Sequence, residues 1–159
     1  MRTGEIVPEF TLPDETGTDR SLSELVSSGP AVLFFYPVAL SGGCTVEACH
    51  FRDLTVDFAN VGAQPIGIST DPVEKQEEFA NKHMLGYPLL SDPDGKVAEQ
   101  FGVRRSFGPI PVKRWTFVID TDRTLLETIK SEMRMSVHAD RALEVLRKRA
   151  EENEPPADK

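Results

Sequence analysis

The sequence has few cysteines, no long apolar run and no large cluster of basic residues, and each shortage excludes a class of protein. No apolar run approaches the roughly 18 residues that a membrane helix needs, and residues 1–6 lack the pattern of a secretory signal. The net charge of −8 argues against nucleic acid or an anionic membrane as the main partner. The basic run 147–149 is followed by glutamates and is typical of a solvated helix end. We expect a cytoplasmic protein.

Cys44 and Cys49 are the only cysteines, so any thiol chemistry must involve one or both of them. A permanent structural disulfide is uncommon in a reducing compartment, and two buried cysteines that act only as small apolar residues are the simplest alternative. Their position favours chemistry instead. They follow the apolar run 31–37 at a strand-to-helix junction that Ser41, Gly42 and Gly43 open.

The chain of 159 residues has the size of one domain, which we place at residues 1–150. Residues 151–159 are charged, contain two prolines and are expected to form a disordered tail. Apolar periodicity and turn residues predict strands at 8–12, 18–22, 31–37, 65–69, 88–91, 115–119 and 125–129. Helices are predicted at 45–60, 73–83, 95–101 and 139–150. Asp71 is the predicted N-cap of the second helix. In the last helix, Ala142, Leu143 and Leu146 lie on the apolar face and are expected to point inward.

This order of elements predicts an α/β fold in which helices flank both faces of a central mixed sheet. The first two strands form an N-terminal hairpin extension, and the whole layout resembles the thioredoxin-like fold. In such sheets ligands bind outside the carboxyl ends of the parallel strands. The loop 38–43 leaves its strand at that edge, so it is a candidate site before any cysteine chemistry is considered.

Cys44 is the better candidate for a reactive thiol because its surroundings favour an anion. A thiolate is a far stronger nucleophile than a thiol. Cys44 is predicted in the first turn of a helix, where free backbone N–H groups and the helix dipole stabilise negative charge. Gly42 and Gly43 allow a small substrate to approach closely, and Ser41 offers a hydroxyl to the sulfur or to a bound oxygen.

The stretch 37–44, Pro-Val-Ala-Leu-Ser-Gly-Gly-Cys, resembles the peroxiredoxin active-site pattern Pro-x-x-x-Thr/Ser-x-x-Cys. Its continuation to residue 53 is similar to the subfamily called peroxiredoxin Q or bacterioferritin comigratory protein. Further matches in the right order are residues 67–71, 87–92 and 114–120. The resemblance spans residues 4–149.

The resemblance implies a thiol peroxidase that reduces hydrogen peroxide and organic hydroperoxides as a monomer, without a metal or organic cofactor. It assigns Cys44 as the nucleophile that becomes a sulfenic acid. Ser41 would orient the peroxide, Pro37 would shield the thiolate from water, and Arg114 would place a guanidinium beside the sulfur. Glu47 would help to hold that arginine or the loop, although a solvated glutamate is the plain alternative.

The resemblance also implies that Cys49 resolves the sulfenic acid as an intramolecular disulfide, which a thioredoxin-like partner reduces. Five residues of α-helix separate two Cα atoms by about 8.6 Å, whereas a disulfide needs about 4.4–6.8 Å. The start of the helix must therefore unwind before the two sulfurs can meet.

Two positions depart from the family pattern, because Ser41 stands for the usual threonine and Gly42 for a common proline. Both changes should loosen the loop. Two other functions stay open: a peroxide-sensing redox switch, and a thioredoxin-like disulfide oxidoreductase, against which the spacing of the cysteines counts. His50, His83 and His138 are scattered, and His50 does not share one helical face with the cysteines, so no metal site is expected.

Overall fold

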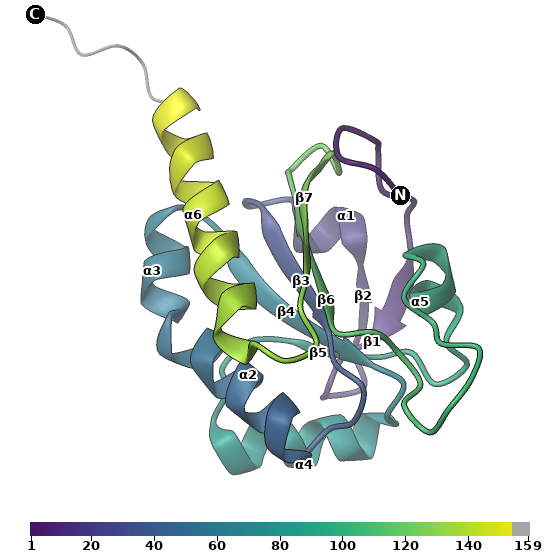
Figure 1. Ribbon diagram of the computed structural model, residues 1–159. Coiled ribbons are helices and arrows are strands. Elements are labelled where there is room, and N and C mark those ends of the chain that lie inside the picture. The colour runs from purple at the N-terminus through teal and green to yellow at the C-terminus, as the bar shows by residue number, and fades with distance from the viewer. Residues whose placement is uncertain (154–159) are drawn as a thin grey trace, which may run out of the picture.

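The computed structural model describes residues 1–153 and has a mixed sheet of five strands at its centre (Figure 1). In the spatial order β5, β4, β3, β6, β7 these strands are Leu89–Ser91, Gln64–Ser69, Ala31–Phe35, Trp115–Ile119 and Leu125–Lys130. β3, β4 and β5 run parallel, while β6 is antiparallel to β3 and β7 is antiparallel to β6. This confirms the predicted mixed sheet.

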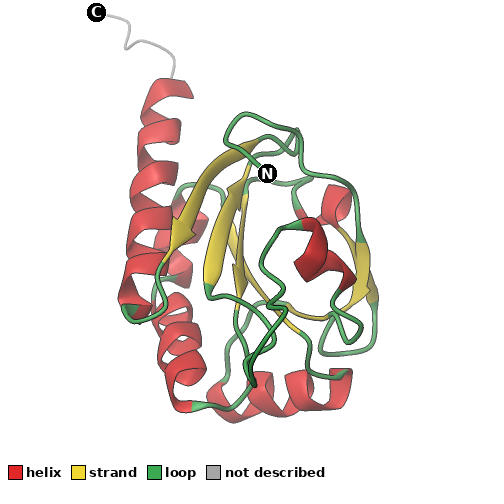
Figure 2. Cartoon of the chain, turned by 45° about the vertical axis from the view of Figure 1, so that its right-hand side comes forward, coloured by secondary structure: helices red, strands yellow, loops and turns green. Residues whose placement is uncertain are grey.

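Helices lie on both faces of the sheet (Figure 2). Successive residues of β3 point to opposite faces and therefore pack into two different core clusters. Val32 and Phe34 pack into one cluster with residues of the four larger helices, and Leu33 and Phe35 pack into the other, under the N-terminal hairpin. The helices are α1 Leu22–Leu25, α2 Gly42–Asp53, α3 Thr55–Asn60, α4 Val73–His83, α5 Lys96–Gln100 and α6 Met135–Asn153. The hairpin consists of β1 Thr11–Pro13 and β2 Asp19–Ser21, as predicted.

The strand pairing brings three distant segments to one edge of the sheet. Phe34 of β3 lies opposite Thr116 near the start of β6, and Phe35 lies opposite Ile68 near the end of β4. The loop that follows β3, the loop that follows β4 and the residues that precede β6 therefore meet. This is the edge at which the sequence places the candidate site.

The prediction of one continuous helix over 45–60 was wrong, because the structure has two helices there. α2 ends at Asp53, and Leu54, with φ −103° and ψ 9°, separates it from α3. The hydroxyl of Thr55 donates to the carbonyl of Arg52 at 2.8 Å. A side-chain donor of this kind competes with the helical ladder and favours a break at this point.

Both ends of α6 differ from the prediction. The helix begins at Met135, four residues earlier than expected, so His138 is part of its inward face with Ala142 and Leu146. It continues to Asn153, so the first three residues of the expected tail are helical, and residues 154–159 lie outside the described residues.

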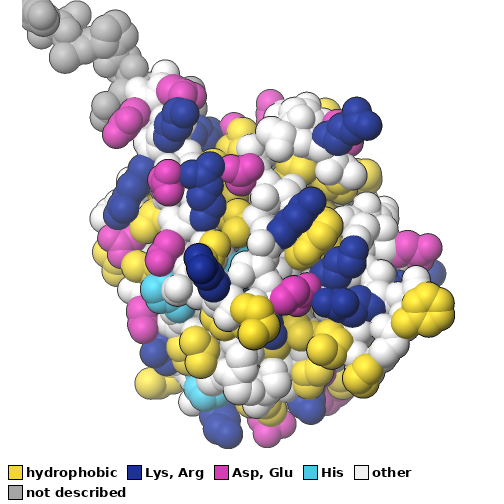
Figure 3. All heavy atoms as spheres, in the orientation of Figure 1, with side chains coloured by type: hydrophobic (Ala, Val, Ile, Leu, Met, Phe, Trp, Pro, Cys, Tyr) yellow, Lys and Arg dark blue, Asp and Glu magenta, His cyan; other side chains and the backbone are white. Residues whose placement is uncertain are grey.

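Basic side chains near the end of α6 pair with acidic residues of other elements. The Arg149 guanidinium pairs with the Asp120 carboxylate at 2.8 Å, and Arg147 lies 3.6 Å from Asp57. Figure 3 shows basic and acidic side chains next to one another over this helix. Within residues 1–153, no helix has the length and apolarity to cross a membrane.

Gly67 of β4 is required by packing, and its substitution gives a test of the fold. A Cβ atom there would lie 2.6 Å from Leu89 Cδ2 and 3.0 Å from Tyr36 Cε1, both in the buried core. We expect Gly67→Ala to lower the free energy of unfolding by about 1–3 kcal/mol, measured by urea denaturation. Gly42→Ala is the control, because a Cβ atom at this position meets nothing within 4 Å. It should leave the free energy of unfolding unchanged or raise it slightly. Equal midpoints for the two variants would contradict this packing.

Candidate active site

The loop between β3 and α2 is fixed to the end of β4 by Asp71. The Ala39 amide and the Ser69 hydroxyl both donate to Asp71 Oδ2 at 2.7 Å. Leu40 has φ +67°, a left-handed conformation that costs a non-glycine residue about 1–2 kcal/mol. The prediction that Asp71 caps α4 was wrong: Pro72 is the N-cap, and the Asp71 carboxylate holds this strained loop instead.

Cys44 is the third residue of α2, in the first helical turn as the sequence predicts, and its side chain is fully buried. Ser41 is the N-cap, but its hydroxyl makes no capping hydrogen bond and donates to the Val38 carbonyl at 2.8 Å. Pro37, two residues after the end of β3, is buried. The first turn of α2 therefore presents its free N–H groups near Cys44, and a peroxide can reach the sulfur only after a neighbouring group moves.

Arg114 lies directly beside the sulfur, although 70 residues separate the two in the chain. Its Nη1 is 3.3 Å from Cys44 Sγ and 3.2 Å from Glu47 Oε1, and the arginine is 7% exposed. The Arg114 backbone amide donates a hydrogen bond to Glu132 Oε1 at 3.2 Å, which fixes the residue just before β6. A Cβ atom on Gly43 would lie 3.4 Å from Arg114 Nη2, an ordinary van der Waals contact, so the guanidinium lies directly beside this glycine.

Glu47 is a buried acid, and the alternative of a solvated glutamate was wrong. Its side chain has no exposed surface, and burial raises its pKa to about 8 despite the opposing effect of the Arg114 guanidinium. Burial thus favours the protonated carboxyl group, whereas Arg114 favours the carboxylate. When Glu47 holds its proton, the positive charge of Arg114 is free to stabilise an anion on Cys44.

His138 of α6 completes the buried polar group, and sequence reasoning missed it. Its Nε2 donates to the Ser131 carbonyl at 2.7 Å and lies 3.4 Å from Glu47 Oε2, and its Nδ1 accepts from the Thr116 hydroxyl at 2.8 Å. Burial and the nearby Arg114 charge lower the pKa of His138, so the ring is neutral. Its spacing of four residues from Ala142 would have revealed it, had the predicted helix begun before 139.

Cys49 lies on the same helix as Cys44 but does not meet it. Both cysteines are free thiols, and Cys49 is only half-buried. α2 is continuous from Gly42 to Asp53. The helical separation of about 8.6 Å between their Cα atoms therefore applies, and it is too long for a disulfide.

Two further predictions concern histidine and metal. His50 was predicted not to share a helical face with the two cysteines. Its Nε2 lies 2.7 Å from the Asp140 carboxylate. Among residues 1–153 there is no group of three or more His, Cys, Asp and Glu side chains placed to hold a metal ion.

The raised pKa of Glu47 predicts a pH dependence of stability. The folded protein binds the Glu47 proton up to about pH 8, whereas the unfolded chain releases it near 4.5. The free energy of unfolding contributed by this group should therefore fall between pH 4.5 and 8, by at most about 1.4 kcal/mol for each pH unit. In Glu47→Gln this fall should disappear, so the difference between the two proteins, followed by urea denaturation, should change across that window. A constant difference would show that Glu47 is ionised throughout.

Comparisons with known proteins identify the family. The model of the AhpC/TSA family matches residues 3–128. Peroxiredoxin Bcp of Escherichia coli is 39% identical over 156 residues, covering 94% of this chain and 98% of its own. The crystal structure of peroxidoxin BcpB from Mycobacterium tuberculosis has a TM-score of 0.90 and 59% identity, covering 93% of this chain and 97% of its own.

A solved structure of lower identity has the same fold. The bacterioferritin comigratory protein of Xanthomonas campestris, described for its alkyl peroxide reduction activity, has a TM-score of 0.81 and 27% identity and covers 89% of this chain and 92% of its own. These matches confirm the resemblance and the thioredoxin-like fold. The chain belongs to the AhpC/TSA family, in its Bcp and peroxiredoxin Q branch, whose activity is that of a thiol peroxidase.

Proposed function

We propose that this protein reduces peroxides with Cys44 as the nucleophile and Cys49 as the resolving cysteine, in a cycle that a thioredoxin-like dithiol completes. The observation that carries the proposal is the 3.3 Å contact between Arg114 Nη1 and Cys44 Sγ in a buried site at the start of α2. A guanidinium in that position favours the thiolate and leaves its charge at the place where a peroxide must bind.

In the first step the Cys44 thiolate attacks one peroxide oxygen, and the O–O bond breaks. The sulfur becomes a sulfenic acid, and the other oxygen leaves as water or an alcohol with the proton that the thiol has given up. Arg114 Nε is buried and has no hydrogen-bond partner among residues 1–153, so it can donate to a peroxide oxygen as charge develops there. Pro37 keeps water from the sulfur. Ser41 would orient the peroxide after its hydroxyl leaves the Val38 carbonyl.

In the second step the Cys49 sulfur attacks the sulfenic sulfur, the S–O bond breaks and water leaves. This step needs the first turns of α2 to unwind, because the helix holds the two Cα atoms about 2 Å beyond the longest usual disulfide span. Gly42 and Ser41, in place of the more common proline and threonine, favour that opening by leaving the backbone and the hydroxyl freer.

The reductant, the substrates and the setting complete the proposal. A thioredoxin-like dithiol attacks the disulfide and returns both cysteines to thiols. Hydrogen peroxide and organic hydroperoxides are the proposed substrates, and the alkyl peroxide activity of the Xanthomonas relative supports the second class. We further propose a monomer in the cytoplasm, with neither nucleic acid nor membrane as a partner, consistent with the net charge of −8.

Cysteine variants test this cycle directly. We expect wild type to turn over peroxide with a thioredoxin system and Cys44→Ser to be inactive. Cys49→Ser should consume about one equivalent and then stall or over-oxidise at Cys44, unless an external thiol resolves it. Peroxide consumption and mass spectrometry of the cysteine peptides measure these outcomes. Full turnover by Cys44→Ser would exclude the assignment, and single turnover by wild type with every reductant would favour a peroxide sensor.

Arg114 variants test the guanidinium. We expect Arg114→Gln to slow sulfenic acid formation about a hundredfold or more, the usual effect of losing a donor to a developing anion. Arg114→Lys keeps the charge but loses the planar fork, so its rate should lie between the two. Arg104→Gln is the control, because it removes the same charge from an exposed arginine that pairs with Glu99. Stopped-flow fluorescence of Trp115, the only tryptophan, measures the rate. Equal slowing in the control would show a nonspecific charge effect.

A further inference from the structure

Tyr87 makes a direct hydrogen bond to α2 at the residue before the resolving cysteine. Its buried hydroxyl donates to the Ala48 carbonyl at 2.6 Å, and the residue is 5% exposed. The Ala48 carbonyl lies inside α2, so it already accepts the helical hydrogen bond from the Arg52 amide. The phenol is therefore a second donor that the helix does not need for its own ladder. It ties α2 to the segment between α4 and β5.

A second contact ties α2 to the same segment. Arg52 Nη1 donates to the His83 carbonyl at 2.9 Å, and the segment 83–87 is turned by Met84, whose φ is +46°. The Phe51 ring also stacks on Phe34 of β3, with 4.3 Å between the ring centroids. These contacts all hold the second half of α2, from residue 48 onward.

The first half of α2 is held by a different set of contacts. Arg114 reaches Cys44 and Glu47. Beyond residue 47, the contact of His50 with Asp140 of α6 adds to those that hold the second half. The two sets meet between Glu47 and Ala48, inside the five-residue span that must shorten for the disulfide. Tyr87 acts at the boundary between them.

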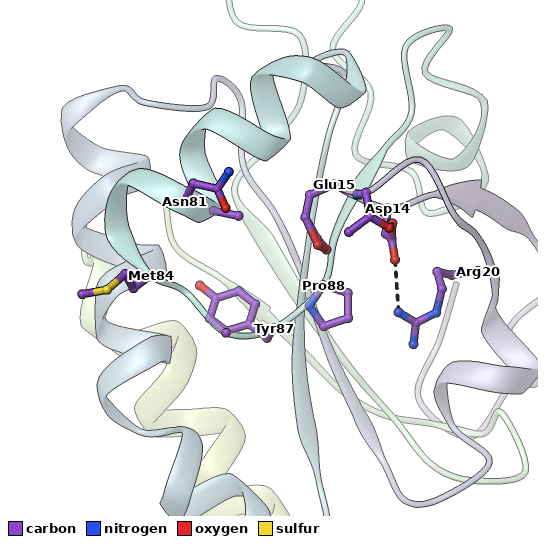
Figure 4. Close-up of a pocket in the computed structure, with 10 residues that line it drawn as sticks. Asp14, Glu15, Arg20, Asn81, Met84, Tyr87 and Pro88 are labelled. Atoms are coloured by element: carbon purple, nitrogen blue, oxygen red, sulfur yellow. Dashed lines mark hydrogen bonds and ion pairs between the residues drawn. The ribbon is translucent and has the colours of Figure 1, made fainter.

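The Tyr87 ring has space on its other side. It borders a pocket of about 600 Å³, which Met84 and Pro88 line on its own segment and Asp14, Glu15 and Arg20 line on the N-terminal hairpin (Figure 4). The hydroxyl points away from Pro88 and from the hairpin residues. The ring itself packs edge-to-face on Phe34, with 5.8 Å between the ring centroids, so a phenylalanine at this position keeps the packing and loses only the hydroxyl. Burial raises the pKa of Tyr87, so the phenol stays a donor at neutral pH.

We propose that Tyr87 is a positioning residue for the resolving step, whose hydroxyl holds α2 closed and thereby limits how often Cys49 reaches the oxidised Cys44. The proposal rests on the proposed Cys44–Cys49 cycle. The chemical step is unchanged: the S–S bond forms, the S–O bond of the sulfenic acid breaks, and water leaves. Tyr87 acts only on the helix opening that precedes it, so it should not affect peroxide attack.

Tyr87→Phe removes the hydroxyl and leaves the Ala48 carbonyl with its helical partner. We expect disulfide formation to become about two- to tenfold faster, the range given by the net contribution of one hydrogen bond. Sulfenic acid formation should keep its rate. The peroxide concentration that over-oxidises half of Cys44 during turnover should rise by the same factor, because resolution competes with over-oxidation. Stopped-flow Trp115 fluorescence and mass spectrometry measure these quantities.

Hydrogen–deuterium exchange of the reduced protein tests the helix opening without any redox step. In Tyr87→Phe the amides of α2 should exchange about two- to tenfold faster, while those of β3 and β6 should not change. Tyr36→Phe is the matched control, because it removes another buried tyrosine hydroxyl, whose partner is the Gln76 side chain on α4. A merely structural loss would make both variants alike.

Unchanged α2 exchange in Tyr87→Phe, or an equal increase in Tyr36→Phe, would overturn the role of Tyr87. So would faster opening with an unchanged rate of disulfide formation. Failure of the proposed function gives a different result: wild type would form no Cys44–Cys49 disulfide in peptide maps after one equivalent of peroxide. The two failures are therefore distinguished by wild type and Tyr87→Phe measured side by side.

Discussion

The site depends on the contacts of one buried guanidinium. Arg114 places it beside both the Cys44 sulfur and the Glu47 carboxyl group. Placing two anions and one cation in a buried space would leave a net negative charge, which burial makes unfavourable. The raised pKa of Glu47 has the same cause, because burial favours the uncharged carboxyl group. With that proton bound, the site holds one anion and one cation. The positive charge is then available to the sulfur. His138, neutral and bonded to a backbone carbonyl, adds no further charge to the pocket.

The fold supplies this arrangement through strand pairing rather than through local sequence. Because β6 is antiparallel to β3, its first residues lie beside the last residues of β3, and Arg114 arrives next to the helix that follows β3. The parallel strand β4 ends at the same edge, and there Asp71 anchors the loop that carries Leu40 in a left-handed conformation. Three segments, none close to another in the chain, therefore fix one sulfur. β3 is buried on both faces, so a one-residue slip in its register would exchange the side chains that its two core clusters receive.

Sequence reasoning predicted most of the fold and the centre of the site, and its failures have physical causes. The strands were readable because buried runs such as that of β3 are continuous and bounded by Gly and Pro. Cys44 and Arg114 were found through a motif. His138 and the role of Asp71 were missed because both depend on contacts between elements: a histidine looks isolated until its helix packs, and an aspartate before a proline looks like a cap. The break at Leu54 coincides with a hydrogen bond from the Thr55 hydroxyl, which apolar periodicity cannot reveal.

The proposed cycle requires the same contacts to hold Cys44 in place and then to release it. While the sulfur is a thiolate, its attraction to Arg114 adds to the hydrogen bonds that keep the first turns of α2 closed. Once the sulfur is a neutral sulfenic acid, its ionic attraction to the guanidinium is lost. Oxidation thus weakens the first half of α2, whereas the contacts of Tyr87 and Arg52 with the second half carry no charge change. The helix is then released first at its N-terminal end, and the contacts of Tyr87 and Arg52 remain to oppose the opening that brings Cys49 and the oxidised Cys44 together.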